Sequence, residues 1–234
     1  MNQQKVALIV GAGPGLSASL ARKFSAEGMK IALASRNTDK LSAIADQTDA
    51  KLYNCDAVDA GQIKHLFSAV VEHLGTPNVV VFNASSRVRG AITDIDPEEV
   101  RTALLVTAYG GFLVGQAAAK LMVSSGQGAI FFTGASAGVK GFPMSATFAM
   151  GKFGLRGLAQ SMARELHPKN IHVVHVVVDG GIRSLEKSRV EGADDEADKW
   201  LDPDAIAETY YHLYTQHRSS WSWEIEVRPW VEKF

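Results

Sequence analysis

Apolar and polar positions alternate along this chain in a regular strand-and-helix rhythm. Short β-branched apolar runs are separated by longer segments whose apolar residues recur at helical spacing. The apolar runs predict strands at Lys5–Val10, Lys30–Ala34, Lys51–Asn54, Asn78–Phe82, Gly128–Thr133, Ile171–Val178 and Trp223–Val227. The helical patterns lie at Leu16–Glu27, Asp39–Asp46, Ala60–Leu74, Pro97–Val123 and Ser145–Leu166, and a last helix starts at Asp202-Pro203.

This rhythm predicts an α/β fold. Short apolar runs without internal alternation are typical of strands buried on both faces, as in a parallel sheet. Their alternation with helices predicts a doubly wound parallel sheet with right-handed crossovers and helices on both faces. The 234 residues fit a single domain, 1–234. Such sheets bind ligands at the carboxyl ends of their strands.

Composition narrows the picture only a little. The net charge of -1 gives no bulk bias toward nucleic acid or an anionic membrane. The first apolar run ends at Gly11. This run is too short for a membrane-spanning helix and lacks the layout of a signal peptide. Cys55 is the single cysteine, so no intrachain disulfide is expected, and a reducing cytoplasm is the favoured location.

A glycine-rich turn joins the first predicted strand to the first predicted helix. It contains Gly11, Gly13 and Gly15, and Leu16 opens the helix. Residues without a Cβ let the backbone approach a pyrophosphate, and the helix N-terminus offers unpaired N–H groups and a positive dipole end. The turn therefore predicts a dinucleotide site, with a plain strand-to-helix turn as the alternative.

The end of the second predicted strand carries a cation where NAD-binding proteins carry a carboxylate. An acidic residue there would bond the ribose 2′-hydroxyl. This chain has Ser35 and Arg36, and a guanidinium forms bidentate, charge-assisted bonds to phosphate. Arg36 therefore predicts NADP, with NADPH preferred over NADH and Ser35 as a second donor. An ordinary surface arginine is the alternative.

The glycine spacing resembles the TGxxxGxG pattern of the short-chain dehydrogenase/reductase family, although Val10 replaces the threonine and Ser17 the third glycine. The resemblance spans nearly the whole chain and implies a Rossmann-type fold. It also implies further cofactor contacts after the third, fourth and sixth strands, at Asp56, Ala57, Asn83, Ala84, Gly180 and Ile182.

The catalytic positions implied by this resemblance are altered. The family carries Tyr-x-x-x-Lys on the helix after the fifth strand, a serine before it and an asparagine on the preceding helix. The flanking match through Gly138, Pro143 and Gly157 fixes the register. That register puts Phe148 at the tyrosine position, Lys152 at the lysine position, Ala135 (beside Ser136) at the serine position and Thr107 at the asparagine position. The resemblance implies that Lys152 binds the nicotinamide ribose. A divergent bacterial subgroup of the family also carries this phenylalanine.

A normal reaction rate would require a substitute proton donor. General acid–base catalysis is worth about 10²–10⁴-fold, and Phe148 has no proton to donate. The candidates are Ser145, Ser136, Thr133, Tyr109 and His175. His172 and His175 lie three apart on a predicted strand and so point to opposite faces, which argues against a shared metal site. We expect no metal.

Two segments bear on movement and assembly. The segment 183–201 is charged, with acidic residues at Asp194, Asp195, Glu196 and Asp198, and is either a solvated loop or a mobile lid over the site. The aromatic stretch Trp221–Trp230 predicts an apolar edge strand, which is a liability when bare. It either covers the sheet's own core or forms the interface of a homodimer or homotetramer.

These observations leave three hypotheses. The first is an NADP-dependent oxidoreductase that acts on a small carbonyl, alcohol or activated double bond. The second is a non-catalytic NADP-binding protein with a regulatory or structural role. The third is a non-redox enzyme on the same fold, because a fold does not determine a function. The expected partner in the first is a small molecule, with no nucleic acid and no membrane.

Overall fold

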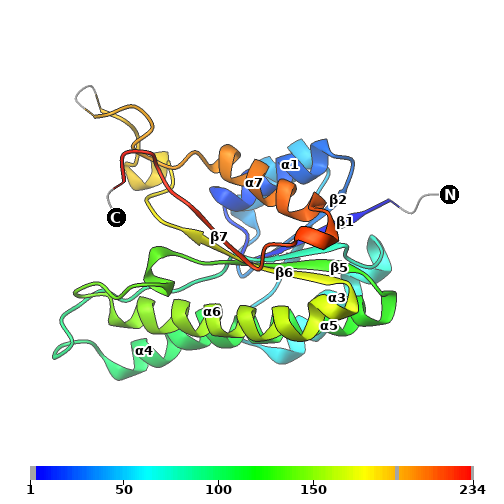
Figure 1. The fold of residues 1–234 in the computed structure, drawn as a ribbon, viewed down its shortest axis with the longest axis horizontal. Coiled ribbons are helices and arrows are strands. Elements are labelled where there is room, and N and C mark those ends of the chain that lie inside the picture. The colour runs from blue at the N-terminus through cyan, green and yellow to red at the C-terminus, as the bar shows by residue number, and fades with distance from the viewer. Residues whose placement is uncertain (1–3, 193–194, 233–234) are drawn as a thin grey trace.

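Seven parallel strands form the central sheet of this computed structural model, which describes residues 4–192 and 195–232. The strand order is β3-β2-β1-β4-β5-β6-β7, which confirms the predicted doubly wound fold (Figure 1). The strands are β1 (Val6–Val10), β2 (Lys30–Ser35), β3 (Lys51–Asn54), β4 (Val79–Phe82), β5 (Gly128–Thr133), β6 (Ile171–Val178) and β7 (Glu224–Val227).

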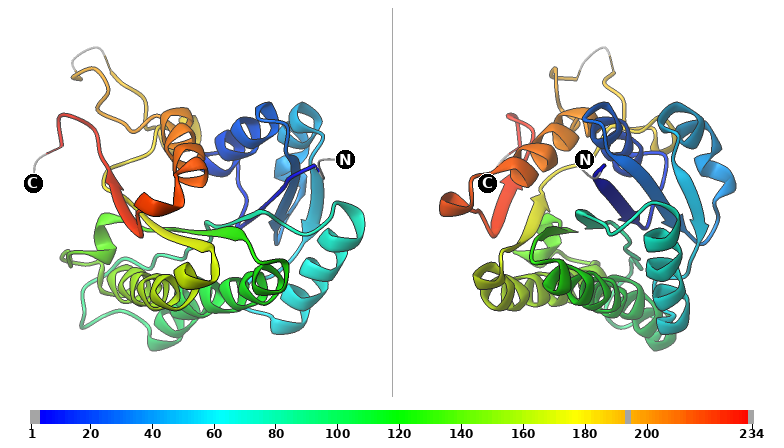
Figure 2. Two further views of the ribbon diagram at one scale, coloured as in Figure 1. Left: turned by 45° about the vertical axis from the view of Figure 1, so that its right-hand side comes forward. Right: turned by 90° about the vertical axis from the view of Figure 1, so that its right-hand side faces the viewer.

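Helices cover both faces of the sheet (Figures 1 and 2). They are α1 (Leu16–Ala26), α2 (Ser42–Thr48), α3 (Ala60–His73), α4 (Pro97–Leu104), α5 (Gly110–Ser125), α6 (Ala146–Leu166) and α7 (Pro203–Thr215). Side chains that alternate along each strand supply two separate cores. Phe132 of β5 faces the core under α3, α5 and α6, whereas Phe131 faces the core under α1, α2 and α7.

The long helix predicted at Pro97–Val123 is confirmed as one helical run, Pro97–Ser125, although its middle is not α-helical. A π-helical turn, Leu105–Tyr109, separates α4 from α5. Such turns are rare and are frequent at functional sites. The helical run reaches Ser125 and is long and apolar enough to cross a membrane by length and composition. Its buried side packs against the sheet in this fold, as the core helix of a globular domain does.

Small differences at the strand ends have local causes. Asn78 was predicted to begin β4 but precedes it, and its Oδ1 accepts a hydrogen bond from the Val6 N–H at 2.8 Å. The short helix predicted at Asp39–Asp46 consists of a 3₁₀ turn, Asp39–Leu41, followed by α2. The strand order reverses between β1 and β4, so the loops after these strands diverge and leave a crevice.

Candidate functional site

The turn between β1 and α1 is shaped by Gly11. Its φ is +80°, and a Cβ there would lie 2.3 Å from the backbone nitrogen of Ala84, so only glycine fits. By contrast, a Cβ on Gly13 or Gly15 would meet nothing within 4 Å. Packing therefore does not demand glycine at these two positions, and the space beside them can receive a ligand. Leu16 begins α1 with its side chain buried.

A cavity of about 580 Å³ lies over this turn, at the carboxyl ends of the strands. The predicted cofactor residues that line it are Gly11, Gly13, Ser35, Arg36, Asp56, Ala57, Asn83 and Ala84. The other predicted residues, Gly15, Leu16, Lys152, Gly180 and Ile182, are not among its lining residues. The sequence analysis missed Lys40, Cys55 and Val106, which line the cavity as well.

Arg36 and Lys40 are two exposed cations on this lining. Within the residues that the structure describes, neither has an acidic partner, so both are available to an anionic ligand. Ser35 Oγ donates to the carbonyl oxygen of Asn37 at 2.7 Å. Its single proton is therefore engaged, which counts against Ser35 as the second phosphate donor. Lys40, four residues after Arg36 in a short 3₁₀ turn, is the second cation on this lining.

Asn83 joins the loop after β4 to the glycine turn. Its Nδ2 donates to Ser17 Oγ at 2.8 Å, and Ser17 Oγ lies 3.4 Å from the carbonyl oxygen of Gly11. Ser17, which occupies the third glycine position of the family pattern, is thus a buried link between the two loops. Nearby, burial together with the charges of Asp56 and Asp59 raises the pKa of the Cys55 thiol to about 11, so the thiol stays protonated at neutral pH.

One face of α6 presents Phe148 and Lys152 with Ser145, the N-cap residue, because spacings of three and four residues stack side chains on a helix. Lys152 is 3% exposed, and its Nζ donates to the carbonyl oxygen of Thr133 at 2.7 Å. Burial lowers the pKa of Lys152 to about 8. Its Nζ lies 5.8 Å from the centre of the Phe148 ring, so the retained lysine stays beside the altered tyrosine position.

Arg87 is a second cation at this ring, and the sequence analysis missed it. Its guanidinium carbon lies 5.1 Å from the centre of the Phe148 ring. Its Nη2 donates to Ser145 Oγ at 3.3 Å. Arg87 comes from the loop after β4, far from α6 in sequence, so only its position four residues after Asn83 could have marked it.

The residues at the other two altered positions, Ala135 and Thr107, each accept a hydrogen bond from a backbone N–H. Ala135 is extended, with φ -162°, and its carbonyl oxygen accepts from Gly138 N–H at 2.8 Å to begin a 3₁₀ turn. Thr107 lies in the π-helical turn and is 1% exposed. Its Oγ1 accepts from the Ser86 N–H at 3.0 Å, which fixes the loop that carries Arg87.

The structure separates the candidate proton donors. Thr133 Oγ1 lies 2.8 Å from Tyr210 Oη, and α7, which carries Tyr210, covers the opposite face of the sheet from α6. Tyr109 is 42% exposed and stacks on Phe112. Ser136 is half-buried in the turn that packs on α6. Ser145 is the candidate that shares a helix face with Phe148 and Lys152.

His175, the fifth candidate, belongs to a buried polar cluster under α6. Its Nδ1 donates to Glu224 Oε2 at 2.9 Å, and Glu224 also accepts two bonds from Arg156 at 2.6 and 2.7 Å. Burial lowers the pKa of His175, although Glu224 opposes the shift. His172 stacks on Trp221 instead, with ring centres 4.6 Å apart. Among the described residues, no three His, Cys, Asp or Glu side chains gather to hold a metal.

The loop after β6 is held by bonds on either side of Ile182, and within the described residues the N–H and C=O of Ile182 make no hydrogen bond. Leu201 N–H donates to Gly181 O at 2.9 Å, and Arg183 N–H donates to Leu201 O at 2.8 Å. Neither bond uses the N–H or C=O of Ile182, which the family resemblance implies as a cofactor contact. Gly180 has φ +149°, and a Cβ there would lie 2.8 Å from Pro229, so glycine is required.

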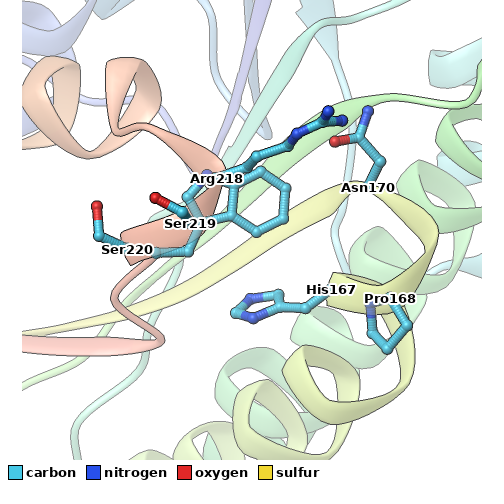
Figure 3. Close-up of a pocket in the computed structure, with 7 residues that line it drawn as sticks. His167, Pro168, Asn170, Arg218, Ser219 and Ser220 are labelled. Atoms are coloured by element: carbon cyan, nitrogen blue, oxygen red, sulfur yellow. The ribbon is translucent and has the colours of Figure 1, made fainter.

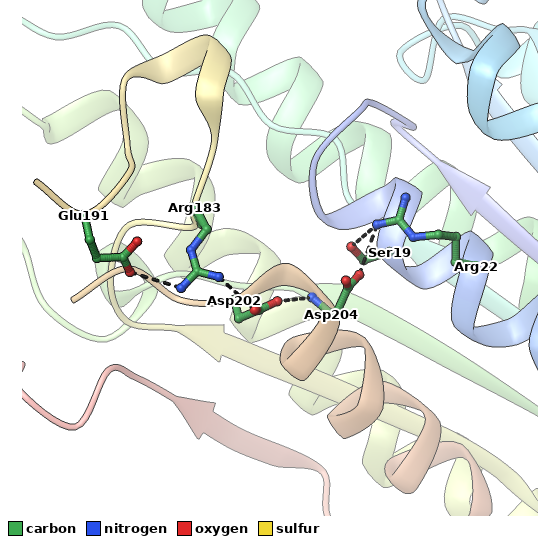
Figure 4. A network of polar contacts seen from close by, with 6 residues as sticks. All are labelled: Ser19, Arg22, Arg183, Glu191, Asp202 and Asp204. Atoms are coloured by element: carbon green, nitrogen blue, oxygen red, sulfur yellow. Dashed lines mark hydrogen bonds and ion pairs between the residues drawn. The ribbon is translucent and has the colours of Figure 1, made fainter. Parts of the chain in front are cut away.

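Ion pairs at the base of the segment 183–201 connect this segment to α7. Arg183 bonds Glu191 at 3.0 Å and Asp202 at 2.9 Å, and Asp202 in turn caps α7 (Figure 4). Asp195 pairs with Lys199 at 2.6 Å. Asp194 lies outside the described residues. Closure of this segment over a ligand stays a prediction.

A second cavity, of about 410 Å³, lies at the opposite edge of the sheet, where β6 and β7 begin. His167, Asn170 and Arg218 contribute polar groups to it (Figure 3). It is far along the strands from the glycine turn, so it does not belong to the dinucleotide crevice.

Comparison with known proteins identifies a family that matches most of this chain. Residues 5–188 match the short chain dehydrogenase family. Trans-4-hydroxycyclohexanecarboxylate dehydrogenase of Sinomonas cyclohexanicum is 34% identical over 181 residues, 73% of this chain and 70% of that protein. A short-chain dehydrogenase from Rhodopseudomonas palustris has a TM-score of 0.83 at 34% identity, covering 97% of this chain and 99% of that one.

A metagenomic short-chain oxidoreductase in complex with NADP has a TM-score of 0.83 at 27% identity, covering 96% of this chain and 97% of that one. The family match spans most of the sequence, and the glycine turn lines the cavity after β1. The chain belongs to the short-chain dehydrogenase/reductase family of NAD(P)-dependent oxidoreductases.

Proposed function

We propose that this protein is an NADP-dependent oxidoreductase that acts on a small carbonyl, alcohol or activated double bond, and that it prefers NADPH to NADH. The observation that carries the proposal is the pair of exposed cations, Arg36 and Lys40, on the cavity wall after β2. A 2′-phosphate is the part of NADP that two such cations would recognise. The related oxidoreductase that binds NADP supports the same cofactor.

The residues present fit this cofactor along the crevice. The open space beside Gly13 and Gly15 admits a pyrophosphate against the backbone. Lys152 would hold the nicotinamide ribose, and the N–H and C=O of Ile182 would hold the carboxamide. When bound, NADPH supplies a hydride to the substrate. The protein's part is to orient the two reactants and to deliver a proton.

In this proposal the proton comes from one of three alternative sources, which are Ser145, water and the substrate itself. Ser145 is favoured among the side chains because it shares a face of α6 with Lys152. The pKa of Lys152, lowered by burial to about 8, lets its ammonium replenish a proton near neutral pH. Such a relay would act in place of the phenol that Phe148 lacks.

The second candidate is a non-catalytic NADP-binding protein. Phe148 and Ala135 favour it, because both positions lack the proton-bearing group of the family. Purified protein tested with NADPH and a panel of aldehydes, ketones and enones separates the two. Turnover supports the oxidoreductase. Tight NADPH binding by calorimetry without any turnover supports the second candidate, and absence of binding defeats both.

The proposal extends to the protein's relatives and assembly. One relative is named for a small hydroxy acid, which places oxo and hydroxy acids in the panel. We propose a cytoplasmic homodimer or homotetramer that belongs to the subgroup with phenylalanine at the tyrosine position. In the stretch Trp221–Trp230, Trp221 stacks on His172, whereas Trp230 is 77% exposed and available to a second copy. A monomer in light scattering at micromolar concentration would contradict the assembly.

A further inference from the structure

We infer that the active site takes an anionic substrate, an oxo or hydroxy acid, and that Arg87 anchors its carboxylate. The inference deepens the proposed oxidoreductase function and rests on it. Arg87 lies where the substrate would meet α6: its guanidinium carbon is 5.1 Å from the centre of the Phe148 ring. The ring marks the place of the family's tyrosine, which touches the reacting oxygen.

The guanidinium is held in place before any substrate arrives. Arg87 Nη2 donates to Ser145 Oγ at 3.3 Å, and Ser145 is 2% exposed. The loop around Arg87 is tied at both sides. Ser86 N–H donates to Thr107 Oγ1 at 3.0 Å, and Gly90 N–H donates to the carbonyl oxygen of Met144 at 3.2 Å. A group fixed in this way loses little freedom when it binds a ligand.

The charge of Arg87 is not balanced by the protein. Within the described part of the chain its partners are the Ser145 hydroxyl and the Phe148 ring, and none is a carboxylate. Asp179, a buried carboxylate after β6, is already paired with Arg228 at 2.8 Å. A guanidinium has five N–H donors, so most remain for a ligand and can bond a carboxylate in the bidentate form.

A second cation faces the same ring. Lys152 Nζ is 5.8 Å from the ring centre and donates to a backbone carbonyl, not to an acid. The Phe148 ring is therefore flanked by two positive groups that have no carboxylate between them. A negatively charged substrate would offset this local excess, whereas a neutral carbonyl compound would leave it.

The rim of the same two loops is apolar. Phe142 and Met144, just before Ser145, are 42% and 51% exposed, and Ile92, just after the Arg87 loop, is 79% exposed. Exposed apolar side chains beside a fixed cation suit a ligand with one charged end and an apolar body. The substrate class is thus a carbonyl or alcohol whose short hydrocarbon body ends in a carboxylate.

The test compares acids with their neutral esters. A series of oxo acids from pyruvate through levulinate to longer chains, each paired with its methyl ester, is reduced with NADPH by the wild type, Arg87→Gln, Arg87→Lys and Arg89→Gln. Arg89 is the matched control. Like Arg87 it is exposed, and it lies two residues further along the chain, but it contacts neither Ser145 nor Phe148.

We expect the wild type to favour the acids. Arg87→Gln should raise KM for the acid about tenfold to a hundredfold, because a charge-assisted hydrogen bond is lost. KM for the ester and the affinity for NADPH should not change. Arg87→Lys should recover part of the effect, and Arg89→Gln should show none. An equal or better reaction with the esters, or an equal loss for acid and ester in Arg87→Gln, overturns the inference.

Failure of the proposed function is distinguishable from failure of the anchor. If the wild type reduces none of the compounds, the oxidoreductase proposal falls, and titration calorimetry of levulinate against the NADP⁺-loaded protein decides the anchor. Binding that Arg87→Gln abolishes and Arg89→Gln keeps supports it. Absence of binding, or binding that both variants keep, overturns it.

Discussion

The two ends of the proposed dinucleotide site differ in how many of the family's functional residues they retain. At the phosphate end, Gly11 fits where no other residue would, and Arg36 and Lys40 line an open cavity. At the proposed nicotinamide end, Lys152 keeps its place, but the side chains of Phe148 and Ala135 carry no polar hydrogen.

Under the proposed function, this difference makes cofactor binding and proton transfer separable in this fold. Binding depends on backbone shape and on charge, so its residues are constrained by geometry. Proton transfer depends on single hydroxyl groups. Phenylalanine differs from tyrosine by one oxygen, so the phenol can be lost with little disturbance of packing.

The largest effect is expected when the lost groups are restored. The Ala135→Ser, Phe148→Tyr double variant should raise carbonyl reduction about 10²–10⁴-fold, roughly 3–5 kcal/mol in the barrier. The new phenol would lie near two cations, which lower its pKa. Steady-state reduction with NADPH measures the change, and it should exceed that of either single variant.

Phe153→Tyr is the matched control, since Phe153 is on the same helix and 44% exposed. It should leave activity unchanged. If the double variant binds NADPH as the wild type does yet reduces no carbonyl compound, the nicotinamide end is not a dormant reductase site. The non-catalytic candidate would then be the better one.

The glycine turn offers a comparison of stability with binding. Gly11→Ala should lower the free energy of unfolding by about 2–5 kcal/mol, from left-handed strain and overpacking against Ala84. Gly13→Ala should change it by less than about 1 kcal/mol, because its Cβ meets open space, and should weaken NADPH binding instead. Denaturant unfolding and calorimetry measure both. Equal destabilisation of the two variants would contradict the distinction.

The buried lysine makes stability depend on pH. The pKa of Lys152 falls from 10.5 to about 8 in the folded protein because of burial. Between these values the folded state binds fewer protons than the unfolded state, so stability should rise with pH across this window, by up to about 3 kcal/mol.

Unfolding of the ligand-free wild type and of Lys152→Met at pH values on both sides of the window isolates this effect, because other groups titrate alike in both proteins. The wild type should gain stability relative to the variant as pH rises. Parallel profiles would mean that the ammonium is solvated.

The smallest effect concerns the phosphate-end cations. Arg36→Ala should weaken NADPH binding about tenfold to a hundredfold with little change for NADH, as a charge-assisted hydrogen bond is lost. Lys40→Ala should cost only about two- to fivefold, since an exposed cation contributes less. Arg36→Asp should reverse the preference. Equal affinity of the wild type for both cofactors, by calorimetry, would refute the assignment.

Several features of this protein were determined by local sequence. Strand and helix alternation follows from short-range periodicity, so the elements agree with the structure within a few residues at most ends. The turn at Gly11 and the position of Arg36 also follow from neighbours in sequence. The register that aligns Phe148 with Lys152 needs only helical spacing, which is why the altered tyrosine position was visible without a structure.

Tertiary packing decided the rest. Arg87 reaches Phe148 only because the loops after β4 and β5 are bonded to each other across the crevice. Glu224 meets His175 because β7 pairs with β6. The π-helical turn around Thr107 lies inside a helix whose periodicity looked regular throughout. Each of these features depends on which loops, helices or strands pack against each other. Periodicity along the chain carries no information about contacts between segments that are far apart in the sequence.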